Sequence, residues 1–195
     1  KRASSFDHAQ EIATPSYYSV DLNDYGIHAE LTGLSRAGIM QFSFEQEGDH
    51  YIVIEPNSDE GVAFVEIDPE KKEITGYNPV HRIYQGYGKE AGFSGHFVIQ
   101  LNEEIADYGV WDSTAITSGR KSAKGQKHAV GAWVKLASDK PGKTRIKIAT
   151  SFTSIDNARK NLASEIPGWD FNEVRQGSSD TWNRALGQIA VKGNN

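Results

Sequence analysis

The chain has 195 residues, a formal net charge of −5 and 24% charged residues, which is the composition of an ordinary soluble globular protein. One domain is expected at this length, and a mildly acidic chain lacks the basic field that would attract nucleic acid as a main partner. The absence of cysteine excludes disulfides and thiol chemistry, and no apolar run reaches the roughly 20 residues that cross a bilayer.

After an N-terminal arm, the first elements predict a β-hairpin. Apolar residues alternate over residues 18–22 and 27–31, and Asn23-Asp24-Tyr25-Gly26 predicts the turn between them. Residues 21–26 also resemble the first half of a calcium loop. Tyr25 occupies a position where an oxygen ligand is required, and Glu30 is out of register, so the hairpin turn is the favoured interpretation.

About ten strands are expected in all. Beyond the hairpin they cover residues 40–44, 51–54, 62–67, 73–77, 80–84, 97–101, 108–111, 130–136 and 144–148. Residues 62–67 and 73–77 are expected to form a second hairpin, turned at Asp68-Pro69-Glu70-Lys71. Residues 51–54 are too apolar for a one-sided surface strand and are expected at the centre of a sheet. A glycine-rich loop is expected over residues 86–95, and a solvated polar loop, rather than a ligand-binding basic patch, over residues 117–128. Many short strands without intervening helices predict an antiparallel β-sandwich.

The periodicity of the apolar residues changes after Phe152, which is expected to close the last strand. The next apolar residues fall at helical spacing: Ile155, Ala158, Leu162 and Ile166. Thr153 with Asp156 predicts a capping box, and Pro167-Gly168 predicts the end of this helix.

A second helix is expected to start at a cap formed by Asp170 and Glu173. Its continuous face is expected to comprise Val174, Ser178, Trp182, Ala185 and Ile189. The predicted organisation is therefore a β-sandwich over residues 1–152 and a helical segment, packing on it, over residues 153–195.

Patterns for phosphate, nucleophile and metal chemistry are weak. Residues 86–91 fit a loosened dinucleotide fingerprint, but Gly92 and Gly95 oppose the helix that such a site needs. Ser94 is followed two residues later by His96, where the nucleophile elbow requires glycine. The six histidines never pair at metal-ligand spacing. Acidic residues near aromatic residues give no pair that converges on a cleft: Asp107, Asp112, Glu165 and Asp170.

Three collinear stretches carry a family resemblance. They are residues 151–171 followed by Trp182-Asn183; Phe6-Asp7-His8 with residues 11–20; and residues 78–86 with Gly92-Phe93-Ser94-Gly95. Together they resemble glycoside hydrolase family 92, whose members are calcium-dependent, exo-acting α-mannosidases that act with inversion. The chain is similar to the end of the N-terminal domain of these enzymes.

The resemblance implies a mutarotase-like sandwich that docks on a following (α/α)6 barrel. In the family the acid, the base and the calcium ligands belong to that barrel, so no catalytic residue, metal ligand or cofactor is expected in this chain. Mannose-containing glycans and the barrel are the expected partners. The loop around Phe93 is the expected contributor to the pocket rim, with Arg82, Tyr84 and Gln85 as weaker candidates for substrate binding. Phe93 and Tyr84 can alternatively serve in core or interdomain packing.

Two further expectations follow from the family. Members carry a glycine- and histidine-rich stretch before the motif that starts at Phe6, whereas only residues 1–5 precede it here, so sugar binding by the chain alone is in doubt. Members are usually exported by bacteria, which implies a periplasmic, cell-surface or secreted location. Two other readings stay open: a free-standing carbohydrate-binding module, and a purely structural interaction domain. Trp169 and Phe171 are expected to anchor the helical segment.

Overall fold

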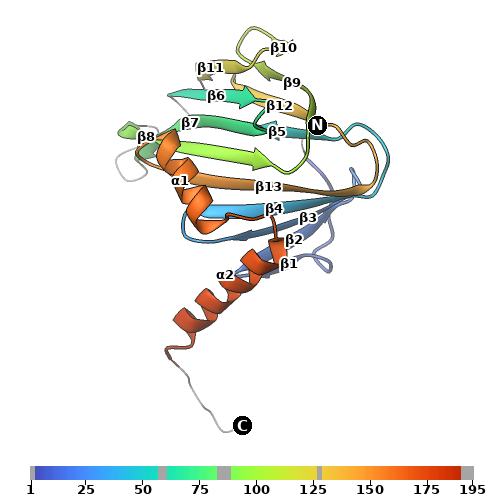
Figure 1. The fold of residues 1–195 in the computed structure, drawn as a ribbon, viewed down its shortest axis with the longest axis vertical. Coiled ribbons are helices and arrows are strands. Elements are labelled where there is room, and N and C mark those ends of the chain that lie inside the picture. The colour runs from blue at the N-terminus through green and yellow to red at the C-terminus, as the bar shows by residue number, and fades with distance from the viewer. Residues whose placement is uncertain (1–2, 57–60, 83–88, 127–128, 190–195) are drawn as a thin grey trace.

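The structure is a computed structural model that describes residues 3–56, 61–82, 89–126 and 129–189, except for the side chains of residues 81, 82, 89 and 90. The described residues form thirteen strands and then two helices (Figure 1). The strands are β1 Ile12–Thr14, β2 Tyr17–Leu22, β3 Ile27–Gly33, β4 Ala37–Phe44, β5 Tyr51–Ile54, β6 Val62–Asp68, β7 Glu73–Arg82, β8 Lys89–Leu101, β9 Ile105–Trp111, β10 Ile116–Ser118, β11 Ser122–Gln126, β12 Gly131–Leu136 and β13 Gly142–Ser151. The helices are α1 Ile155–Glu165 and α2 Phe171–Leu186. The predicted mainly β architecture with two C-terminal helices is confirmed.

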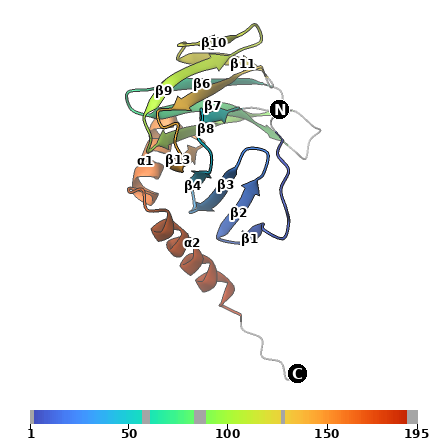
Figure 2. The same cartoon turned by 90° about the vertical axis from the view of Figure 1, so that its right-hand side faces the viewer.

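Two antiparallel sheets form the sandwich (Figure 2). The larger sheet has nine strands in the order β1-β2-β3-β4-β13-β8-β7-β6-β11, and the smaller has four in the order β10-β9-β12-β5. β13 lies in the middle of the larger sheet, where it pairs with β4 through Ile146↔Met40 and with β8 through Ile148↔Ile99. Strands that are far apart in sequence are thereby joined around β13.

The main core lies between the two sheets. Alternating residues of β12 contribute Ala132, Val134 and Leu136, all at most 2% exposed. They pack in one cluster with residues of the larger sheet such as Val65 and Ile74, both 0% exposed. The strict period of two in residues 130–136 therefore predicts this strand and its buried face correctly.

Both predicted tight hairpins are confirmed. β2 pairs with β3 through Leu22↔Ile27, and β6 pairs with β7 through Ile67↔Ile74. In the second turn, the Asp68 carboxylate accepts a hydrogen bond from the amide of Lys71, at 3.1 Å. Side-chain bonds of this kind let an aspartate specify a turn locally, which makes such turns readable from sequence.

The prediction of a central strand over residues 51–54 is wrong. β5 is an edge strand of the smaller sheet, and Tyr51 and Val53 are 47% and 56% exposed. The Tyr51 ring lies edge-on to Trp133 of β12, at 6.0 Å between centroids. Apolar character on the outward face here reflects aromatic cross-strand packing rather than burial.

Two predicted loops are strands where the structure describes them. The glycine-rich segment belongs to β8 from Lys89 onward, and the polar segment forms β10 and β11 around a turn at Gly119, whose φ is +72°. β10 pairs with β9, and β11 pairs with β6. Pairing with a neighbouring strand supplies backbone hydrogen bonds whatever the polarity of the side chains, so composition alone was misleading.

The helix boundaries follow their caps. The Ser154 hydroxyl, not Thr153, caps α1 by accepting from the amide of Asn157 at 3.1 Å, while Thr153 accepts from the Asn157 side chain at 2.7 Å. Asp170 caps α2 as predicted, accepting from the amides of Asn172 and Glu173 at 2.9 and 3.2 Å. Neither described helix has the length and apolarity needed to cross a membrane.

The helices cover the outer face of the larger sheet, opposite the smaller sheet (Figures 1 and 2). A second core there contains Ala158, Leu162, Ile166 and Phe171 of the helical segment, each at most 2% exposed, packed on Ile39, Val98 and Ala149 of the sheet. Four residues of the predicted face, Val174, Ser178, Trp182 and Ala185, lie in α2, but the helix ends at Leu186, before Ile189. Burial of this face stops at Ser178, which is 2% exposed. Trp182 and Leu186 are 44% and 60% exposed, because the second half of α2 extends away from the sandwich.

Glu165, at the end of α1, joins the helical layer to the sheet. Its carboxylate accepts from the amides of Arg36 and Ala37 at 2.9 and 3.0 Å and from the Arg36 guanidinium at 2.8 Å. Burial raises the pKa of Glu165, but the hydrogen bonds and charge of Arg36 and the amide of Ala37 outweigh it, so its pKa lies below the ordinary value.

We predict that Glu165→Gln lowers the free energy of unfolding at pH 7 by about 1–2 kcal/mol. A depressed carboxyl pKa contributes stability above the ordinary glutamate pKa, and this contribution is lost as the pH falls through the folded-state pKa. The difference between wild type and variant should therefore shrink steadily below about pH 4.5. Urea denaturation at pH 7, 5 and 3.5 measures it, with the exposed Glu47→Gln as control; a difference independent of pH would contradict the assignment.

Gly76 of β7 packs where no side chain fits. A Cβ there would lie 2.2 Å from the carbonyl oxygen of Phe64 and 2.5 Å from the ring of Phe97. We expect Gly76→Ala to lower the free energy of unfolding by about 2–3 kcal/mol, measured by thermal or urea unfolding. Gly177→Ala, in open space on α2, should instead stabilise the chain by about 0.5–1 kcal/mol, and equal effects of the two changes would refute the packing argument.

Candidate functional site

Of the four residues that sequence reasoning assigns to substrate binding, Phe93 is described with its side chain. It lies in β8 and is 48% exposed. Arg82 is the last residue of β7, and its side chain lies outside the described part of the structure, as do Tyr84 and Gln85 entirely. The geometry of the site is therefore built from Phe93 and its described neighbours.

Phe93 lies on a β-bulge. Ser94 and Glu90 of β8 pair with Pro79 and His81 of β7, so three residues of β8 stand opposite one residue of β7. Gly92, inside the bulge, has a φ of +88°, in the left-handed region that favours glycine. A bulge redirects the side chains that it carries, and such irregularities are frequent beside binding sites.

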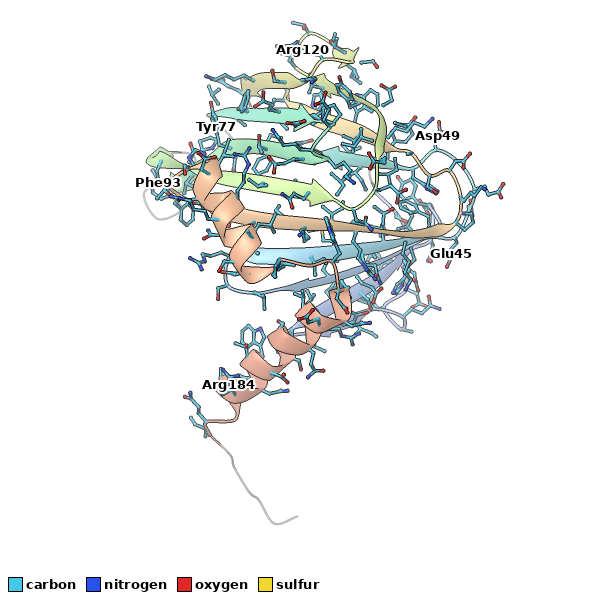
Figure 3. All side chains as sticks on the ribbon, in the orientation of Figure 1. Glu45, Asp49, Tyr77, Phe93, Arg120 and Arg184 are labelled. Atoms are coloured by element: carbon cyan, nitrogen blue, oxygen red, sulfur yellow. The ribbon has the colours of Figure 1, made fainter. Side chains whose placement is uncertain are left out.

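The Phe93 ring meets Phe152, which follows β13 and precedes α1. Their centroids are 5.4 Å apart with an interplanar angle of 86°, and Phe152 is 69% exposed. We call these two residues the aromatic corner; Figure 3 shows Phe93 at the end of the sheet beside the first turn of α1. Sequence reasoning placed Phe152 inside the last strand, but β13 ends at Ser151. Its proximity to Phe93 could be foreseen only from the pairing of β8 with β13.

Hydroxyl and amide side chains lie next to the aromatic corner. The Ser151 hydroxyl lies 2.9 Å from that of Thr153, which accepts from the amide side chain of Asn157 at 2.7 Å. Exposed aromatic rings beside hydroxyl and amide groups suit a sugar, because the rings cover its apolar face and the polar groups bind its hydroxyls.

A row of rings crosses the neighbouring strands. Phe64 stacks on Tyr77 at 5.7 Å, and Tyr77 meets His96 edge-on at 5.9 Å between centroids. His96 pairs with Ser151 across β8 and β13, so the row ends next to the segment that carries Phe152. The buried Nδ1 atom of His96 has no hydrogen-bond partner among the described residues.

The carboxylates singled out from sequence serve local structure. Asp112 accepts from the Arg120 guanidinium at 2.7 Å, Asp107 from the amide of Tyr108 at 2.8 Å, and Asp170 caps α2. No group of three or more potential metal ligands gathers within the described ranges. These carboxylates therefore stabilise local structure: Asp112 pairs with a cation, Asp107 binds a neighbouring amide and Asp170 caps a helix.

A hollow of about 570 Å³ lies between the β1–β2 turn and α2. Residues 14–17 form one wall, and Arg175, Trp182 and Leu186 belong to the other. The Arg175 guanidinium lies 3.6 Å from the centroid of the Tyr17 ring, a cation–π contact between the two walls. The wall formed by α2 runs from Asn172 to Leu186 and so includes the exposed second half of the helix.

Comparison with known proteins divides the chain in two. Residues 1–151 match the glycosyl hydrolase family 92 N-terminal domain, and residues 157–195 match the glycosyl hydrolase family 92 catalytic domain. An uncharacterized secreted glycosidase of Arthroderma benhamiae is 28% identical over 200 residues, which covers 92% of this chain and 25% of that protein.

Solved structures agree. An inverting family 92 mannosidase of Bacteroides thetaiotaomicron VPI-5482 superposes with a TM-score of 0.87 and 26% identity, covering 100% of this chain and 25% of that one. A family 92 α-mannosidase from Bacteroides thetaiotaomicron gives 0.83 and 25%, covering 98% and 26%. The chain thus spans about a quarter of the length of the relatives that it matches.

Over three-quarters of its length, including the β-bulge and both sheets, the chain matches one domain family, and its helices match the domain that follows. The chain belongs to glycosyl hydrolase family 92, of which it comprises the N-terminal domain and a short piece of the catalytic domain.

Proposed function

We propose that this chain is the non-catalytic N-terminal part of an exo-acting α-mannosidase, where it docks on a helical barrel and shapes the rim of the mannose pocket. The barrel would supply the acid, the base and the calcium ion for hydrolysis with inversion. Export to the periplasm, the cell surface or the medium is part of the proposal, supported by the secreted relative.

The observation that carries the docking role is the exposed second half of α2. Trp182 and Leu186 are apolar, exposed and on a helix that matches the catalytic domain of the family. Large apolar side chains exposed together on a projecting helix are typical of an interface. The helix thus presents a surface suited to the rest of the barrel.

The aromatic corner supports the role at the pocket rim. Phe93 and Phe152 are exposed, perpendicular to each other and adjacent to hydroxyl and amide groups. We propose Phe93 as the principal sugar contact from this chain, with Arg82, Tyr84 and Gln85 as further contacts. Calcium binding is assigned to the barrel and not to this chain.

A free-standing carbohydrate-binding module is the second candidate, because the same aromatic corner could bind sugar without a barrel. Isothermal titration calorimetry of the purified chain with mannose, α-mannobiose and galactose separates the two functions. We expect no saturable heat, since half of the proposed pocket would be missing, and no turnover of an aryl α-mannoside. A saturable, mannose-selective isotherm would favour the binding module, and turnover by chain free of contaminating enzyme would overturn the proposal.

Phe93 distinguishes packing from sugar binding. In this chain Phe93→Ala should change the free energy of unfolding by less than about 1 kcal/mol, whereas Phe97→Ala, at a buried ring, should cost about 3–5 kcal/mol. In the full-length enzyme Phe93→Ala should lower kcat/KM for mannobiose about tenfold, a loss of about 1.4 kcal/mol of transition-state binding.

Replacements at the same position supply the control. Phe93→Trp keeps an aromatic face and should retain most of kcat/KM, whereas Phe93→Leu keeps only bulk and should not. Full activity in Phe93→Leu would assign the ring to interdomain packing instead.

A further inference from the structure

The connector between the helices, residues 166–169, is held by two basic side chains of the sheet. Lys147 of β13 donates from Nζ to the carbonyl oxygen of Ile166 at 3.1 Å. Arg145, two residues earlier on the same face of β13, donates from Nη1 to the carbonyl oxygen of Trp169 at 2.8 Å. The two residues therefore grip the connector at both of its ends.

The end of α1 needs such a donor. The last four carbonyl groups of a helix lack partners within it, and the helix dipole favours a cation at that end. The last turn of α1 contains no basic residue, and the helix stops before Pro167. Lys147 supplies from the sheet the positive charge that the sequence of α1 does not provide.

Burial and a contact with Trp169 hold the Lys147 side chain beside the connector. The residue is 5% exposed, and no carboxylate is paired with it in the described part of the chain. Its ammonium lies 4.3 Å from the centroid of the Trp169 ring, a cation–π contact. A buried cation without these contacts would be costly, so Lys147 and the connector must stay together.

Further contacts tie the segments on either side of the connector. Arg159 of α1 donates from Nε and Nη2 to Glu73 Oε1 at 3.0 and 2.8 Å, and Glu73 is 4% exposed. In α2, Ser178 donates to the carbonyl oxygen of Gly33 at 2.8 Å. Beyond Ser178 the helix loses the buried face that fixes its first half.

We propose that Arg145 and Lys147 are positioning residues that clasp the connector, so that α1 and the first half of α2 form one rigid body with the sandwich. The rigid body then ends within α2, beyond Ser178, and movement of α2 relative to the sandwich is confined to that second half of the helix. It does not coincide with the sequence boundary between residues 151 and 157 that separates the two family domains.

The clasp fixes the direction in which α2 leaves the sandwich. Its consequence for catalysis, that the sandwich aims the barrel toward the aromatic corner, rests on the proposed function. The rigidity itself does not, so a measurement on this chain alone can refute the rigid body and leave the proposed function standing.

Native-state hydrogen exchange of the 195-residue chain tests the rigid body. Amides of residues 159–166 and 175–178 should exchange within about tenfold of the rates in β13, and amides of residues 183–186 at least about 100-fold faster. Exchange in α1 as fast as in the end of α2 would overturn the proposal.

Variants test the clasp. Lys147→Met keeps the stem but removes the charge and the donor, and should speed exchange at residues 163–174 by about tenfold or more while β6 and β12 keep their protection. Lys160→Met, on the exposed side of α1, is the matched control and should change nothing. If Lys147→Met does not fold, Arg145→Met should loosen the same residues, and unchanged protection in whichever variant folds would assign the connector to apolar packing alone.

Discussion

The fold depends on β13, a central strand whose two faces meet different layers. Thr144 and Ile146 face the smaller sheet and contribute to or border the main core, whereas Lys147 and Ala149 face the helices. A strand buried on both sides usually consists of apolar residues only. Here the outer face carries buried polar side chains, and these groups require partners because unpaired buried polar atoms are costly.

The helical segment supplies those partners. The carbonyl oxygens of the connector accept from Lys147 and Arg145, and the Arg159 guanidinium meets Glu73. Buried polar networks of this kind add little net stability compared with apolar packing, but they favour one arrangement over others. The outer layer is thus specified by matched hydrogen bonds as well as by the apolar contacts of Leu162 and Phe171.

Local patterns in the sequence correctly predicted those strands, turns and caps that depend on interactions between residues close in sequence. The alternation in β12, the turn at Asp68 and the Asp170 cap each depend on residues that are neighbours in the chain, and all three were predicted correctly. The predictions were wrong where pairing with a strand that is distant in sequence determines the structure. Residues 116–118 and 122–126 became strands because β9 and β6 offered them edges, and residues 51–54, predicted at the centre of a sheet, lie at its edge.

The two residues of the aromatic corner differ in the same respect: one could be predicted from a contiguous stretch of sequence and the other could not. A family resemblance could point to Phe93, since the segment around it is contiguous. Phe152 could not be found without knowing that β8 and β13 are neighbours, because fifty-eight residues separate it from Phe93.

The positions of the aromatic corner and of the clasp both depend on β13. Phe152 leads from β13 into the cap of α1, and Lys147 holds the other end of α1, so one strand determines the position of both. A ring can contribute to recognising a sugar only if its distance from the catalytic groups is fixed, because small misplacements cost large factors in rate. The rigid outer layer provides a fixed frame for the aromatic corner. Residues 151–171 contain the end of β13, the start of α1 and the connector, so this segment links the sheet to the helices.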